Sequence, residues 1–196
     1  MFKLNKVIFL SIICLSPLVD SSAQVNRSGF NFAVGAGFGY SNHAEAYIVE
    51  EKLGIIEEYS GFRAFSTNLK VGWGITPRAQ VFYTLHFTPP NATISPYESV
   101  YHGGIITYSF ESVENLLISA GAGINIAHDM NKGELARGTL GNIAVAYEFS
   151  PHFSLELNSI FGKMENNPPP LSFFSSSKEF SLMLTINYLF YKYADE

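Results

Sequence analysis

The sequence predicts an all-β protein of eight antiparallel strands, and three observations support this prediction. Large apolar residues alternate with small or polar residues along eight segments of roughly 10 to 14 residues each. The connections between these segments are alternately short turns and long polar stretches. No stretch after the first 23 residues contains the ~20 consecutive apolar residues that a membrane-spanning helix needs.

The chain begins with the features of a secretory signal peptide. Two lysines precede an apolar run from Val7 to Val19, and small residues follow up to Ala23. This run covers roughly 13 residues, too few for a helix that crosses ~30 Å of hydrocarbon. We therefore expect residues 1–23 to be removed, and residues 24–196 to form a single domain.

The only cysteine of the chain, Cys14, lies within the predicted signal peptide. Lipidation of Cys14 is an alternative interpretation, but Ile13 stands where a small residue is expected and the apolar run continues beyond it. Residues 24–196 contain no cysteine, so neither a disulfide nor a thiolate metal site can stabilise them.

The predicted mature chain is mildly acidic and poor in charge. The whole chain has 12 Lys and Arg against 17 Asp and Glu, and removal of Lys3, Lys6 and Asp20 leaves 10 against 16, a net charge of −6. Because no basic run is present, nucleic acid is not an expected partner. Charged residues make up 15% of the chain, against a usual ~25%, and aromatic residues also reach 15%.

Each strand is predicted from its apolar face, which takes every second residue. In the first four segments these faces run from Phe30 to Tyr40, Phe65 to Ile75, Val81 to Phe87, and Val100 to Phe110. In the last four they run from Leu116 to Ile126, Ile143 to Phe149, Phe153 to Phe161, and Phe180 to Phe190. The fourth segment is the least regular, since His102 and Gly104 interrupt its apolar face and Ile105 falls on the other one.

The connections predict how these strands are arranged. Three are short, at Thr76–Arg78, Glu111–Asn115 and Ser150–His152, and four are long, at His43–Gly61, Pro89–Ser99, His128–Gly138 and Met164–Glu179. An even number of strands with alternating short turns and long loops is typical of an up-and-down barrel in a membrane. Both termini then lie on the side of the short turns.

The composition of the second face indicates which side of the barrel meets lipid. A barrel in water with an apolar interior needs many charged residues outside, whereas here the second face is mainly Gly, Ala, Ser, Thr and Asn. Small residues suit the narrow interior of eight strands, so the apolar face is predicted to contact lipid. Aromatic residues near the short turns then form an interfacial belt of Phe30, Trp73, Tyr83, Tyr108, Phe110, Tyr147, Phe149, Phe153, Tyr188 and Phe190.

From Gly29 to Tyr191 this pattern resembles the small eight-stranded outer-membrane proteins of the OmpA, OmpX and OmpW type. The resemblance implies an eight-stranded antiparallel up-and-down transmembrane β-barrel in the cell outer membrane, in contact with its lipid and lipopolysaccharide. Ile186–Phe190 resembles the C-terminal signal that such proteins present to the outer-membrane assembly machinery. In the family an aromatic residue usually ends the chain, whereas Tyr191–Glu196 follow here.

Several polar side chains are predicted to point into the lumen. The candidate lumen network comprises Lys70, His86, Glu148, Glu156 and Asn158, together with Gln80, Asn125 and Asn187. Because a buried charge is costly unless it is paired, we predict a Lys–Glu network that fills the lumen. Structural packing is the favoured interpretation, and a gate in a narrow water path is the alternative.

The sequence favours a structural or interaction role through four surface loops. The first long connection, His43–Gly61, carries five glutamates interleaved with apolar residues. It is compatible with binding a surface partner, with binding divalent cations, or with a solvated loop that binds neither. A narrow pore or carrier for small solutes and a lipid A-modifying enzyme are the alternatives. His102 with Ser99 is the only pair to consider for acyl-transfer chemistry, and no family motif supports it. We expect no enzymatic activity, cofactor or metal.

Overall fold

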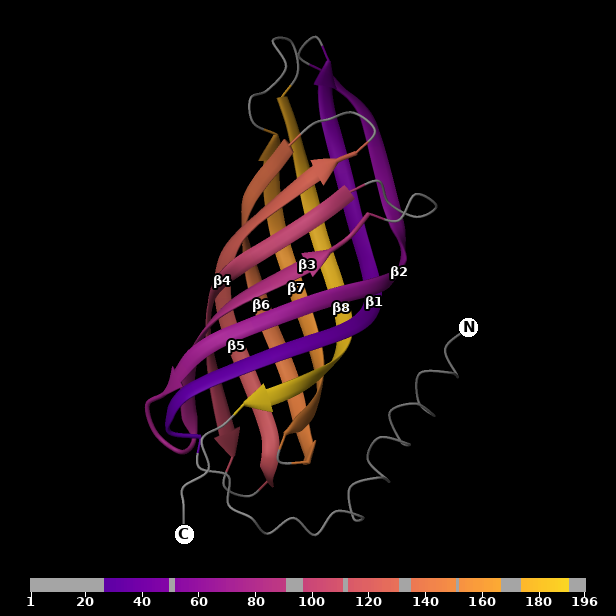
Figure 1. Cartoon of the computed structure of the whole chain (residues 1–196). Helices are drawn as coiled ribbons and strands as arrows, with labels where there is room; N and C mark the ends of the chain where they lie inside the picture. Colours follow the sequence, from indigo (N-terminus) through magenta and orange to yellow (C-terminus); the bar gives the residue numbers. More distant parts are fainter. Residues whose placement is uncertain are drawn as a thin grey trace, which may run out of the picture.

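The eight predicted strands close into one barrel. The computed structural model describes residues 27–49, 52–90, 97–110, 113–130, 135–150, 152–166 and 174–190. Its strands are β1 (Gly29–Val49), β2 (Lys52–Gly74), β3 (Ala79–Thr88), β4 (Tyr97–Phe110), β5 (Val113–Asp129), β6 (Leu135–Ser150), β7 (Phe153–Asn166) and β8 (Phe174–Phe190). Each strand pairs antiparallel with the next and β8 pairs with β1, which confirms the predicted fold class (Figure 1). The predicted signal peptide lies outside the described residues.

Period-two alternation separates an inner and an outer face on every strand. Along β3, Phe82, Thr84 and His86 are buried inside, while Val81 and Tyr83 are exposed on the outside. The inner and outer faces agree with the predicted ones on all eight strands, including the irregular β4. Within the described ranges, no helix is long and apolar enough to cross a membrane.

The strands are longer, and the connections shorter, than the sequence predicts. β1 and β2 have 21 and 23 residues and convert most of the predicted loop His43–Gly61 into a hairpin. The other three predicted loops are also shortened, since β4, β6 and β8 begin at Tyr97, Leu135 and Phe174. The predicted strand ends were wrong because backbone pairing between strands continues beyond the region where lipid contact requires apolar and polar residues to alternate.

The short turns gather at one end of the barrel, where β1 begins and β8 ends (Figure 1). At the β2–β3 turn the Thr76 hydroxyl accepts hydrogen bonds from the backbone N–H groups of Arg78, at 3.2 Å, and Ala79, at 2.9 Å. This side-chain arrangement stabilises a tight reversal without glycine. We refer to this end as the turn end and to the other as the loop end.

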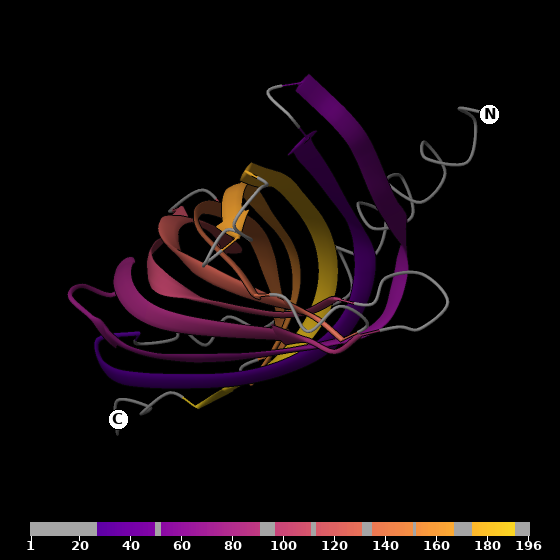
Figure 2. The same cartoon turned by 90° about the horizontal axis from the view of Figure 1, so that it is seen from above.

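The β1–β2 hairpin reaches well beyond its neighbour β3. β3 has 10 residues and pairs with β2 only from Thr67 to Gly74. Nearer the loop end, β1 pairs with β2 on one side and with β8 on the other, up to Ile48 opposite Phe174. Figure 2 shows this hairpin leaning away from the barrel wall at the loop end.

Candidate functional site: the lumen and the lipid-facing wall

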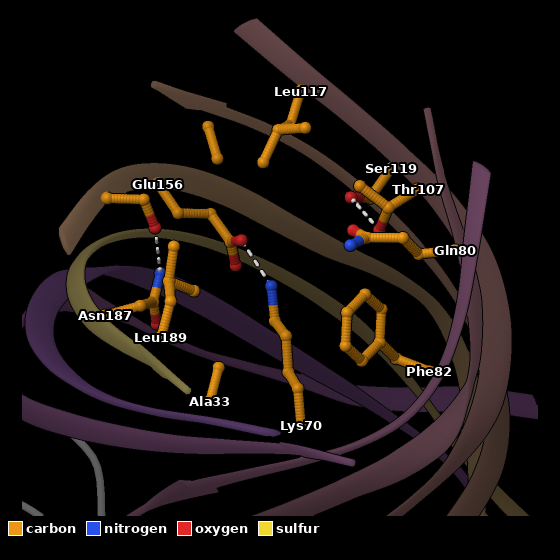
Figure 3. Close-up of a pocket in the computed structure, with 12 residues that line it drawn as sticks. Ala33, Lys70, Gln80, Phe82, Thr107, Leu117, Ser119, Glu156, Asn187 and Leu189 are labelled. Atoms are coloured by element: carbon orange, nitrogen blue, oxygen red, sulfur yellow. Dashed lines mark hydrogen bonds and ion pairs between the residues drawn. The ribbon is translucent and has the colours of Figure 1, made fainter. Parts of the chain in front are cut away.

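A buried ion pair crosses the lumen. Lys70 on β2 donates from Nζ to Oε2 of Glu156 on β7, so the two side chains meet from opposite parts of the wall (Figure 3). Their side chains are only 8% and 3% exposed. The structure thus brings together two of the five residues of the predicted lumen network.

A small cavity lies beside this ion pair. It has a volume of about 30 Å³, room for about two water molecules. Its wall includes Gln80, Phe82, Leu117 and Leu189, and two side-chain hydrogen bonds join other residues that line it (Figure 3). These bonds join Thr107 and Ser119 at 2.8 Å, and Asn187 Nδ2 to Ser154 Oγ at 3.4 Å. The described part of the lumen is therefore packed around the ion pair.

Glu148 forms a second, separate ion pair at the turn end. The guanidinium of Arg27 donates to both carboxylate oxygens of Glu148, with Nε 3.3 Å from Oε1. The backbone carbonyl of Arg27 also accepts a hydrogen bond of 2.7 Å from Asn31 Nδ2. Sequence reasoning missed Arg27, because it precedes β1 and takes no part in the alternation.

Two other predicted network members, His86 and Asn158, contact residues outside these pairs. His86 is buried against Tyr101 on β4, with ring centroids 5.8 Å apart, and neither of its ring nitrogens has a hydrogen-bond partner among the residues that the structure describes. Asn158 exchanges side-chain amide hydrogen bonds of 3.4 and 3.5 Å with Asn142 on β6. The lumen therefore holds several local polar groups in place of one connected network.

Apolar side chains close much of the remaining lumen. A buried cluster comprises Tyr101, Ala127, Ala136, Leu140, Ile160, Met164 and Met183. Leu140 and Met164 are fully buried, although the sequence placed Met164 at the start of a predicted loop. An interior filled by side chains is what a barrel of eight strands allows.

The outer wall has the opposite character. Its exposed residues include apolar side chains from all eight strands, among them Phe38, Trp73, Val81, Ile106, Ile118, Ile143, Leu157 and Ile186, each at least 38% exposed. An apolar exterior around a polar, packed interior is the architecture of a membrane-spanning β-barrel.

Solved structures with the same architecture are known. The outer membrane protein AlkL, determined by solid-state NMR in DMPC lipid bilayers, matches 87% of this chain over 94% of its own, with a TM-score of 0.52 and 12% identity. The fold is that of small outer-membrane barrels. OprG from Pseudomonas aeruginosa is also similar, with a TM-score of 0.48 and 11% identity over 87% of this chain and 100% of OprG. Ail of Yersinia pestis has a TM-score of 0.47 and 14% identity over 83% of this chain and 99% of Ail. No protein-family profile matches the sequence, and no curated relative does.

The predicted aromatic belt of this outer-membrane-type barrel lies on the outer face at the turn end. Trp73 is 60% exposed, and the ring of Tyr188 contacts those of Phe153 and Phe190 edge to face, with centroids 5.1 and 4.6 Å apart. The remaining predicted members also point outward: Phe30, Tyr83, Tyr108, Phe110, Tyr147 and Phe149.

The one pair considered for catalysis is split by the barrel wall. Ser99 points into the lumen, where its hydroxyl donates to Asn125 Oδ1 at 2.9 Å. His102 points outward and shares a hydrogen bond of 3.0 Å between Nδ1 and the Tyr83 hydroxyl. Ser99 and His102 are therefore not within hydrogen-bond reach of one another. Among the described residues, no group of three or more His, Asp, Glu or Cys side chains is placed to hold a metal ion.

Proposed function

We propose that this protein lies in the outer membrane and uses its closed barrel as an anchor for surface interactions made at the loop end. The observation that supports this most is the difference between the packed lumen and the extended hairpin. Lys70–Glu156, Arg27–Glu148 and the apolar cluster fill the interior, which leaves little room for solutes. The β1–β2 hairpin, by contrast, has far more residues than the membrane requires.

The length of the hairpin supports a role outside the bilayer. A tilted strand needs about 9–11 residues to cross the hydrocarbon, and β3 has 10. β1 and β2 have about twice as many, so roughly half of each extends past the membrane.

One edge of the hairpin is available for pairing. Among the described residues, no strand pairs with β2 between Lys52 and Ser66 on the side away from β1. A strand edge of this kind can bind an extended polypeptide through its backbone N–H and C=O groups. A polypeptide partner at the surface is therefore the kind of interaction that this hairpin supports best.

Protease treatment of intact cells tests the location. Proteinase K added outside is expected to cut at residues 50–51 or in the 167–173 connection and to leave the strands protected. Cleavage only after the outer membrane has been permeabilised would contradict the proposal.

A hairpin-shortened variant tests the interaction role. Replacing residues 40–62 by a two-residue turn joins the paired residues Gly39 and Arg63, removes most of the free edge and leaves the crossing part of β1 and β2 intact. Cells with the full hairpin are expected to clump or to attach to immobilised polypeptides more strongly than cells with the shortened one. Equal attachment would contradict an interaction role for the hairpin.

Conductance and lipid chemistry test the two alternatives. We expect purified protein in planar bilayers to give no stable conductance steps, because the lumen is packed, and we expect no change in lipid A mass on expression. Stable steps that Lys70→Met alters would favour the pore. A modified lipid A would favour the enzyme.

A further inference from the structure

The free edge of β2 contains one regular segment, Ile55–Arg63. Its pairing with β1 runs evenly from Tyr47 opposite Ile55 to Gly39 opposite Arg63, and a register shift interrupts it at each end. Within the described ranges, no strand pairs with these nine residues on the side away from β1. Because alternate residues of a strand turn their backbone N–H and C=O groups to the same side, roughly half of them present both groups to that side.

The register shift nearer the membrane bends this segment away from the barrel. Between the pairs Gly37–Ser66 and Gly39–Arg63, β2 has two residues where β1 has one. An extra residue of this kind bends a strand and increases its twist. β3 stops pairing with β2 at Thr67, just before this point, and the hairpin leans outward beyond it (Figure 2). The edge of the regular segment therefore lies apart from β3, the strand that covers β2 nearer the membrane.

The hairpin carries an excess of negative charge. Residues 39–63 contain five glutamates against Lys52 and Arg63, and five minus two leaves a net charge of −3. Two of the glutamates, Glu57 and Glu58, lie within the regular segment of the edge itself. Charged residues on an open strand edge oppose pairing with strands of like charge. This edge therefore disfavours acidic polypeptides, including a second copy of the same hairpin.

The backbone register places like charges opposite one another. Glu45 of β1 is paired with Glu57 of β2, and two like charges in such a position are unfavourable. Lys178 of β8 is paired with Ala44 of β1, on the side of the hairpin away from the free edge. A positive charge beside β2 would reduce the repulsion between Glu45 and Glu57. A basic partner therefore complements this edge.

We propose that the free edge of β2 over Ile55–Arg63 binds an extended, positively charged polypeptide as an additional strand. This inference rests on the interaction role proposed above and specifies its partner. The backbone N–H and C=O groups of the edge supply hydrogen bonds that any extended chain can make. The excess of glutamates selects a chain rich in lysine or arginine and speeds its approach at low salt.

Fluorescence anisotropy with a labelled peptide tests the proposal. The full barrel is placed in nanodiscs of phosphatidylcholine without lipopolysaccharide, so that the membrane has no net negative charge. The probe is a peptide as long as the regular segment, with threonine and lysine in alternation and both ends blocked. It is expected to bind saturably, and its affinity is expected to fall as salt is added, because salt screens the attraction between the charges.

Two control peptides separate backbone pairing from charge. The first has the same sequence with every backbone nitrogen methylated, so it keeps its charge and loses its N–H donors. It is expected to bind at least about tenfold more weakly. The second has glutamate in place of lysine and is expected not to bind. Equal binding of the methylated peptide would show attraction by charge alone and would overturn the proposal.

Paired substitutions in the barrel test the charge of the edge. Glu57→Gln/Glu58→Gln keeps the backbone edge and is expected to weaken binding of the basic peptide about threefold or more. Glu98→Gln/Glu165→Gln is the matched control, because it removes the same charge near the loop end on β4 and β7. This control is expected to bind the peptide like the native protein. Equal affinities of the two double variants would contradict selection by the glutamates of the edge.

The outcomes distinguish failure of this proposal from failure of the interaction role. If the full hairpin promotes attachment of cells while the acidic peptide binds the barrel as tightly as the basic one, the interaction role stands and the basic partner is overturned. If the hairpin makes no difference to attachment and neither peptide binds, both proposals fail. Dimers of the native barrel that exclude the peptide would assign the edge to a second copy of the chain and would also overturn the proposal.

Discussion

The two surfaces of the barrel wall place opposite demands on neighbouring residues of the same strand. Lys70 is buried in the lumen and paired with Glu156, whereas Val71, the next residue, is 36% exposed on the outer wall. Gly103 and Gly104 are also adjacent in β4. A Cβ atom on Gly103 would lie 2.4 Å from the Ala122 carbonyl oxygen, but a Cβ on Gly104 would meet nothing within 4 Å.

This difference shows which physical constraint each face places on its residues. In the lumen a side chain must have the right size and a charged group must have a partner, so the stability of each inward residue depends on the side chains across the lumen. The outer wall demands only apolar character, because lipid adapts to the shape of the side chains. Substitutions should therefore be costly inside and tolerated outside, even at adjacent positions.

The largest effect is expected for the Lys70–Glu156 ion pair. Lys70→Met leaves Glu156 buried without its cation and should destabilise the barrel by about 3–5 kcal/mol. Val71→Ala, its neighbour on the outer wall, should cost less than about 1 kcal/mol. Urea unfolding in detergent micelles measures both changes, and the double variant Lys70→Met/Glu156→Met should recover much of the loss. Equal effects at positions 70 and 71 would contradict the comparison.

The adjacent glycines give a smaller but better matched test. Gly103→Ala should destabilise by about 1–3 kcal/mol, because the added methyl group meets the backbone of β5. Gly104→Ala has space on the outer wall and should be neutral or should stabilise by up to about 1 kcal/mol, since the unfolded chain becomes less flexible. The same urea titration compares the two variants. A larger loss at position 104 would reverse the assignment of the two faces.

The smallest effect is expected for the polar pair on the outer wall. Tyr83→Phe removes the 3.0 Å hydrogen bond to His102 and should cost about 1 kcal/mol. Adding His102→Phe should return most of this loss, because no unpaired polar group then faces lipid. Unfolding curves of the two single variants and the double variant give the coupling energy. Additive losses would show that the two side chains do not interact.

Much of the fold could be predicted because lipid contact leaves a regular pattern in the sequence. Alternation identified all eight strands and their outward faces, and it placed Lys70 and Glu156 in the lumen before their contact was known. Strand ends could not be predicted in the same way. Once β1 and β2 pass beyond the bilayer, lipid no longer contacts one face of each strand, so the alternation fades while the backbone pairing continues.

The partners across the lumen could not be predicted either. Which residues meet depends on the stagger of strands that lie far apart in sequence, and alternation carries no information about stagger. Arg27 was missed as the partner of Glu148 for this reason and because it precedes the first strand. Glu179 was assigned to a loop, although β8 begins five residues earlier at Phe174 and places its carboxylate inside the barrel.

Contact between the outer wall and lipid is the central claim, and the single tryptophan of the chain tests it most directly. Trp73 is 60% exposed on the outer wall near the turn end, where the aromatic belt lies. In vesicles, its fluorescence should be quenched by brominated lipids, most strongly when the bromines lie near the headgroups, and only weakly by iodide in the water. Strong quenching by iodide with no effect of brominated lipid would show that this wall faces water.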